Sequence, residues 1–241
     1  MFRKLVQTAG MFACVVGTAS LASAQVVQSL NVGGGFVWPS GYDARFDVDR
    51  ETMIANLTSE DPLQFDISRF RGGQFFGEWN LAFGDHVELS AGVSYYKRTV
   101  PSFYRDLVNE GGRDIAQDLK LRMIPITAMV RFMPVGSASE FQPYVGAGLA
   151  IISWRYSEVG EFVDPFDYSI FAARYAASAV DLGPVVAIGA RVPLDGDIYG
   201  LTIEFRYQWG TGDTGGIDAG FLGDKIDLRA GSLTFGFLIR F

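Results

Sequence analysis

The sequence predicts an all-β protein, an eight-stranded antiparallel up-and-down transmembrane β-barrel with long extracellular loops and short periplasmic turns. Three observations predict this fold. Eight segments alternate apolar with small or polar residues at the period of two that marks a β-strand. The connections between them alternate long and short. Aromatic residues stand at the two ends of the segments, as they do at the two interfaces of a membrane.

The N-terminus has the pattern of a secretory signal peptide. Arg3 and Lys4 precede a largely apolar stretch, and the small residues Ala22 and Ala24 form a cleavage site before Gln25. We therefore predict a cleaved signal peptide over 1–24 and one outer-membrane β-barrel domain over 25–241. The single cysteine lies within the signal, so the exported chain would have no disulfide.

The composition excludes two other classes of protein. No run of eighteen apolar residues follows the signal, which argues against helical membrane spans. The formal net charge is −7, and loss of Arg3 and Lys4 would make it −9, which argues against nucleic acid as a partner. The 29 glycines favour β structure with close backbone approaches.

The predicted strands alternate with four long and three short connections. The strands cover 29–38, 74–83, 87–95, 120–132, 144–154, 180–192, 199–209 and 233–241. The long connections cover about 40–72, 97–118, 157–177 and 210–225. Such regular sorting of lengths is typical of a barrel with loops outside and turns in the periplasm.

Two strands are less regular than the others. In 120–132, Lys120 and Arg122 share a face with apolar residues, so either Pro125 marks a bulge or the strand extends above the membrane before it. In 144–154 both faces are apolar, which leaves its orientation open; we place Tyr144 and Trp154 outward and Arg155 inward.

The last two strands have the clearest alternation. In 199–209, Glu204 and Arg206 are predicted to face the lumen, and Phe205 and Tyr207 the lipid. The last strand presents an apolar face that ends the chain on an aromatic and would serve as the assembly signal: Leu233, Phe235, Phe237, Ile239 and Phe241.

The aromatic girdles follow from this topology, because alternate strands end at opposite interfaces. The predicted outer girdle is Trp38, Tyr95, Trp154 and Trp209. The predicted periplasmic girdle is Phe83, Phe132, Tyr144, Tyr199 and Phe241.

Charged residues within the strands lie mainly on the face opposite the apolar one. The predicted lumen charge network is Glu78, Glu88, Arg131, Arg155, Asp181, Arg191, Glu204, Arg206 and Arg240. An eight-stranded barrel is only wide enough for its own side chains, so near-balanced charges would neutralise one another and plug it. The rival interpretation, an ion-conducting, porin-like pore, would favour one sign of charge.

No residue pattern predicts catalysis, a cofactor or a metal. The hydrolytic chemistries of small membrane barrels commonly need a histidine base near the outer rim. The single histidine, His86, falls in a predicted periplasmic turn. We therefore expect a protein that is not an enzyme.

The chain resembles the small outer-membrane β-barrel superfamily that includes the OmpA barrel, OmpX and OmpW. The residues that carry this resemblance are the terminal Arg240-Phe241, the segment 143–149 (PYVGAGL) and the cleavage site 22–24. The resemblance implies residence in the outer membrane of a Gram-negative bacterium, among its lipids and lipopolysaccharide. It also implies delivery by periplasmic chaperones and recognition of the last strand by the barrel-assembly machinery.

Two function classes follow. The first is a structural or surface-interaction protein with a salt-bridged, largely closed lumen. The second is an OmpW-like narrow channel for small hydrophobic compounds with a lateral exit. Inward apolar residues near the outer end would favour the channel, and Leu149 and Ile151 are the hint for them.

Overall fold

The computed structural model describes residues 26–39, 67–164, 167–194, 198–221 and 225–241, and shows a closed barrel. The predicted signal peptide, its cleavage site and most of the first long connection lie outside the described residues. Among the described residues, no helix reaches the length and hydropathy that a membrane span requires.

The barrel consists of eight antiparallel strands, as predicted, in the order β1-β10-β7-β6-β5-β4-β3-β2. Its strands are β1 (Val26–Pro39), β2 (Gly72–Phe83), β3 (Val87–Val108), β4 (Asp114–Phe132), β5 (Gln142–Val163), β6 (Ile170–Pro193), β7 (Tyr199–Gln208) and β10 (Ala230–Arg240). The remaining elements are the short pair β8 (Thr211–Asp213) and β9 (Lys225–Asp227) and the 3-10 helices η1 (Ile67–Phe70) and η3 (Gly216–Ala219).

The first and last strands close the ring. Val32 lies opposite Phe237 and Gly34 opposite Phe235 in an antiparallel register that runs the whole length of β10. This pairing leaves no free sheet edge in the barrel, which is the condition for strands to exist in hydrocarbon.

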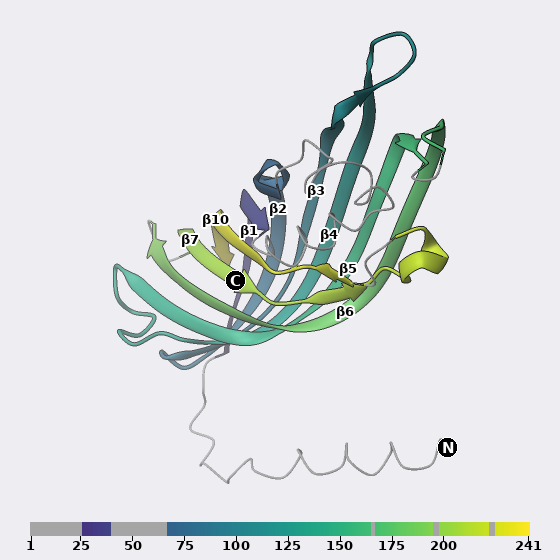
Figure 1. Ribbon diagram of the computed structural model, residues 1–241. Helices are drawn as coiled ribbons and strands as arrows, with labels where there is room; N and C mark the ends of the chain where they lie inside the picture. The colour runs from purple at the N-terminus through teal and green to yellow at the C-terminus, as the bar shows by residue number, and fades with distance from the viewer. Residues whose placement is uncertain (1–25, 40–66, 165–166, 195–197, 222–224) are drawn as a thin grey trace, which may run out of the picture.

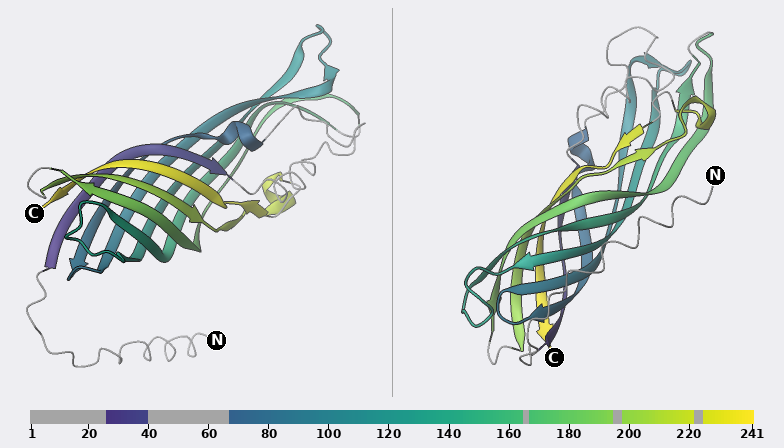
Figure 2. Two further views of the ribbon diagram at one scale, coloured as in Figure 1. Left: turned by 90° about the vertical axis from the view of Figure 1, so that its left-hand side faces the viewer. Right: turned by 90° about the horizontal axis from the view of Figure 1, so that it is seen from below.

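The four middle strands are much longer than the rest. β3, β4, β5 and β6 have 22, 19, 22 and 24 residues, whereas the other barrel strands have 10 to 14. They continue past the barrel as two hairpins, which Figure 1 shows rising above the ring and Figure 2 shows from two further sides. We call this the hairpin end, and the opposite one, where 84–86 and 133–141 connect strands, the turn end.

The structure corrects the predicted loops and decides between the two alternatives for the strand that contains Pro125. Residues 97–118 and 157–177, expected as long loops, are mostly strand. The register of β4 on β5 runs through Pro125 unchanged, so there is no bulge there and the strand extends instead. Residues 210–225, expected as a loop, contain β8, η3 and the start of β9.

The outward face of the barrel is an apolar band. Leu30 on β1, Ile126 on β4, Leu182 on β6 and Phe235 on β10 are all between 41% and 65% exposed, although they belong to strands whose alternate residues are buried. An exposed apolar belt around a closed barrel is the surface that faces lipid in a membrane barrel.

Candidate functional site

The lumen of the barrel holds a charge-balanced cluster. Its members, which we call the lumen charge cluster, are three carboxylates and three guanidiniums: Glu78, Glu88, Glu204, Arg131, Arg191 and Arg206. They come from β2, β3, β4, β6 and β7, each at an inward position of its strand.

Arg131 lies at the centre of this cluster. Its guanidinium is 2.6 Å from Glu78 Oε1, 3.3 Å from Glu88 Oε1 and 2.5 Å from Glu204 Oε2, and its side chain is only 1% exposed. It also donates a hydrogen bond of 3.1 Å to Asn80 Oδ1. A guanidinium has five N–H donors in a fixed fork, so one residue can bind several carboxylates at once.

The other two arginines extend the cluster along the barrel. Arg206 Nη2 donates to Glu204 Oε1 at 2.6 Å and to Glu78 Oε2 at 2.9 Å. Arg191 donates two bonds of 3.0 Å to Glu88, one from each terminal nitrogen. Each carboxylate thus contacts two guanidiniums, and these contacts offset part of the free-energy cost of removing the charges from water.

Tyr144 contacts the cluster, although it was predicted as a periplasmic girdle residue. Its hydroxyl donates to Glu204 Oε2 at 3.0 Å, and the Arg131 guanidinium lies 4.8 Å from its ring centroid. The girdle prediction was wrong because both faces of β5 are apolar, so alternation alone could not set its orientation.

Trp154 and Arg155 were also predicted on the wrong faces. Trp154 is 1% exposed, and its indole N–H donates to Asp181 Oδ2 at 2.5 Å inside the barrel. Arg155 is exposed on the outward face. Leu149 and Ile151 likewise face outward, with 54% and 47% exposure, so they do not line the lumen.

The remaining predicted positions divide as follows. Asp181 and Arg240 are inward but outside the cluster, and Arg240 donates to Gln142 Oε1 at 3.2 Å. The girdle residues that lie on the outward face are Trp38, Tyr95, Trp209, Phe83, Phe132, Tyr199 and Phe241. Within the terminal strand, Leu233, Phe235, Phe237 and Ile239 share this outward face.

Inward glycines make room for the cluster, a signal that sequence reasoning did not use. A Cβ at Gly146 would lie 3.0 Å from Arg131 Cγ, and one at Gly92 would lie 3.2 Å from Glu78 Cγ. At Gly189 it would lie 2.6 Å from the Tyr144 hydroxyl oxygen. Large polar side chains in a narrow barrel need small residues beside them on the same inner surface.

Above the cluster, toward the hairpin end, the interior becomes apolar. Tyr96, Met123, Ile152, Trp154 and Leu228 belong to one buried hydrophobic cluster. A cavity of about 20 Å³, lined in part by Tyr96, Met123 and Arg206, lies between the two regions. This is space for about one water molecule.

Below the cluster, a larger polar cavity of about 150 Å³ lies at the turn end. Glu88, Arg191, Arg240 and Asp85 line it, together with Met133 and Ser137. The described part of the lumen is thus a polar vestibule, a salt-bridged middle and an apolar upper part.

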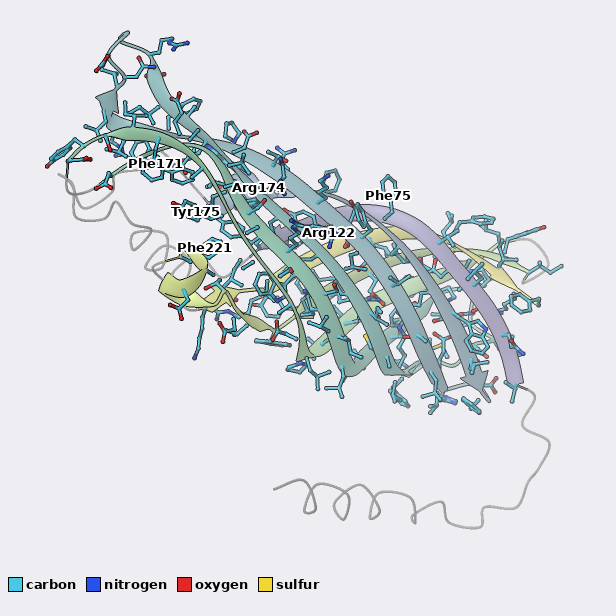
Figure 3. All side chains as sticks on the ribbon, turned by 90° about the vertical axis from the view of Figure 1, so that its right-hand side faces the viewer. Phe75, Arg122, Phe171, Arg174, Tyr175 and Phe221 are labelled. Carbon is cyan, nitrogen blue, oxygen red and sulfur yellow. The ribbon has the colours of Figure 1, made fainter. Side chains whose placement is uncertain are left out.

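Beyond the apolar band, aromatic residues join the hairpins to the β8–β9 region. Phe162 on β5 makes an edge contact with Tyr175 on β6, with ring centroids 5.0 Å apart, and Phe221 lies 6.4 Å from Tyr175. Phe171, Tyr175 and Phe221 gather at the hairpin end in Figure 3. Burial also raises the pKa of the Tyr104 hydroxyl, which lies in a second cluster with Ile115 and Phe162.

The described residues hold no candidate metal site. No group of three or more His, Cys, Asp or Glu side chains there could hold a metal ion. His86 lies exposed in the turn between β2 and β3, stacked on Phe132 at a centroid distance of 6.3 Å.

Comparison with known proteins finds similarity of structure without similarity of sequence. No family model and no curated protein matches this chain. The crystal structure of the outer membrane protein OprG from Pseudomonas aeruginosa is similar, with 14% identity, a TM-score of 0.51, and coverage of 89% of this chain and 95% of that one.

Two further structures match with lower scores. A major outer membrane protein from Thermus thermophilus has 16% identity and a TM-score of 0.46, covering 89% of this chain and 99% of that one. Ail, the attachment invasion locus protein of Yersinia pestis, has 9% identity and a TM-score of 0.44, covering 90% and 99%. The closed eight-stranded barrel and the match to OprG show that the chain has the fold of small bacterial outer-membrane β-barrels, as the sequence predicted.

Proposed function

We propose that this outer-membrane barrel is a structural and surface-interaction protein whose lumen is closed. The turn end would face the periplasm and the hairpin end the outside, since short turns are periplasmic in this class. The observation that carries the proposal is the lumen charge cluster, in which three carboxylates and three guanidiniums contact one another across the barrel.

The cluster supports closure for two reasons. Arg131 and Glu78 are each about 1% exposed, so neither is available to a passing ion. Their charges are neutralised by contacts of 2.5 to 3.3 Å, and an ion entering would have to break these contacts in a low-dielectric space.

Planar-bilayer recording tests this proposal. We expect the refolded protein to give no discrete current steps. The test variant is Glu78→Ser, Arg131→Ser, Glu204→Ser, Arg206→Ser, which is charge-neutral overall. Current steps from this variant alone, once it inserts as a barrel, would mean that the charge cluster closes the lumen. Steps of similar size from both proteins would overturn the closed lumen, and heat-modifiable gel mobility would establish that both are folded.

A second candidate function is a narrow passage for small hydrophobic compounds. The observation that favours it is the apolar interior at the hairpin end, where Ile152, Trp154 and Met123 line the upper lumen. A lateral exit would have to open between strands in this region. Uptake of a hydrophobic fluorescent dye by cells tests it: faster uptake with the protein than without, altered by Trp154→Ala, would favour the passage over the closed barrel.

We further propose that the protein is not an enzyme. The single histidine of the chain is His86, which is exposed at the turn end, far from the outer leaflet in the proposed orientation. Hydrolysis of outer-leaflet lipid by the purified protein, lost on substitution of a single carboxylate, would contradict this proposal.

A further inference from the structure

A row of three cations crosses the outer wall of the barrel just above its apolar band. Lys97 on β3 lies directly opposite Arg122 on β4, and Arg122 lies directly opposite Arg155 on β5. All three side chains lie on the outward face of their strands. Arg122 is labelled in Figure 3. Because neighbouring strands are about 4.8 Å apart, the three side chains start within about 10 Å of one another.

This arrangement is unfavourable for the protein alone. Like charges directly opposite on neighbouring strands repel, and their pairing destabilises a sheet. Within the described residues, no ion pair joins Lys97, Arg122 or Arg155 to a carboxylate. Lys120, next along the outward face of β4, adds a fourth positive charge before Asp118 is reached. Such a row is suited to an anion with several oxygen atoms.

An apolar groove lies lower on the same three strands and on the neighbouring β2. It has a volume of about 490 Å³, and three alanines form its shallow part: Ala91 on β3, Ala128 on β4 and Ala147 on β5. Trp79 and Leu149 stand at its sides. We call this the alanine groove; it faces lipid, and its lining is almost wholly apolar.

The row and the groove are in register. Ala91, Ala128 and Leu149 are cross-strand neighbours, and each lies six positions below a cation of the row, at 97, 122 and 155. Six residues of strand span about 20 Å, or about 15 Å of depth at a tilt near 40°. This is about half the hydrocarbon thickness of a bilayer, the depth that one leaflet's acyl chains reach.

We propose that this wall binds one phosphorylated, multiply acylated lipid of the outer leaflet, with its phosphate on Lys97, Arg122 and Arg155 and an acyl chain in the alanine groove. The negative charge of the phosphate would offset the repulsion among the three cations. The acyl chain of the lipid would fill the alanine groove. The proposal deepens the proposed function, because it rests on the hairpin end lying outside.

The test measures lipid binding by the refolded full chain in detergent micelles, using native mass spectrometry and diphosphorylated, hexa-acylated lipid A as the probe. The variant Lys97→Gln, Arg122→Gln, Arg155→Gln removes the row, and Ala128→Phe fills the groove. Matched controls are Arg113→Gln, an exposed arginine in the β3–β4 turn, and Ala190→Phe, an outward alanine of β6 outside the groove.

We expect the triple variant to bind the probe at least about tenfold more weakly, because hydrogen bonds between charged groups are lost. Ala128→Phe should also weaken binding, and both controls should bind like the unaltered protein. Lipid A without phosphates should bind the unaltered protein as weakly as intact lipid A binds the triple variant.

Two results would overturn the proposal. Equal binding by all variants would mean that the lipid associates elsewhere. Displacement of the probe by millimolar inorganic phosphate, with no effect of Ala128→Phe, would leave a phosphate site without a lipid. Neither result bears on conductance, because neither the cation row nor the alanine groove faces the lumen, so failure here and failure of the closed lumen are distinguishable.

Discussion

Arg131 and Glu204 are 73 residues apart in the chain, yet their side chains meet at 2.5 Å in the middle of the lumen. Arg131 points inward from β4 and Glu204 from β7, on different parts of the barrel wall. The contact therefore crosses the interior and joins two walls that share no backbone hydrogen bond.

Replacing Arg131 should be among the most destabilising single changes in this protein. Arg131→Ala leaves three buried carboxylates short of a partner, and removing one partner of a buried pair costs about 3–5 kcal/mol. Arg229→Ala is the control: its bridge to Asp227 has an arginine side chain that is 40% exposed, so the loss should be below about 1 kcal/mol. Urea unfolding in detergent or lipid measures both, and similar losses would contradict a central role for Arg131.

A charge on the lipid-facing surface should be costly only within the apolar band. Phe205→Arg places a cation at an outward position of β7 and should cost about 2–4 kcal/mol if that position is near the midplane. Ala172→Arg introduces the same charge on the outward face of β6 beyond the band, opposite Glu161, where we expect little change. Folding free energies in lipid vesicles compare them, and equal costs would mean that the band is misplaced.

Phe241 should matter more for assembly than for stability. It is 72% exposed and its backbone N–H donates one bond to Gln28, so its removal leaves the β1–β10 pairing nearly intact. The truncated protein should refold in detergent with a modest loss, but its amount in the outer membrane of cells should fall sharply. Near-normal yields both in detergent and in cells would contradict the role of Phe241 as an assembly signal and leave it as a girdle residue only.

Alkaline pH should weaken the contact between the two hairpins through Tyr104. Burial raises the pKa of this hydroxyl in the folded protein above its ordinary value of 10.0. Above pH 10 the unfolded form therefore ionises first, so stability contributed by the neutral phenol is lost as the pH rises. Titration of phenolate absorbance should show late-ionising tyrosines, and Tyr104→Phe should lower their number by one.

The sequence predicts the faces of a strand well where its two environments differ. Glu204 and Phe205 are adjacent, one facing an ionic interior and the other lipid, and their alternation sets the orientation of β7 correctly. On β5 the upper lumen is itself apolar. The lumen-facing Trp154 and the lipid-facing Ile151 are therefore both hydrophobic, and their alternation does not show which face of the strand points inward.

Charge is ambiguous for a similar reason. An arginine in a strand can lie in the lumen or beyond the membrane, and Arg131 and Arg155 are one example of each. The difference depends on how far the strand continues past the band, which local alternation does not encode. Nor does any local pattern reveal that Gly146 leaves room for Arg131, because that contact joins neighbouring strands.

The unequal strand lengths give the protein a tall side and a low side. From Tyr95 to Val108, β3 continues for thirteen residues, or about 40 Å along the strand, before the turn at 109–113. A peptide epitope inserted at Gly111 or Gly112, both exposed, would be carried well clear of the bilayer on a paired two-stranded support. The same insertion in the short connections at the turn end would stay hidden from an antibody added to intact cells, so the barrel could serve as a one-sided display scaffold.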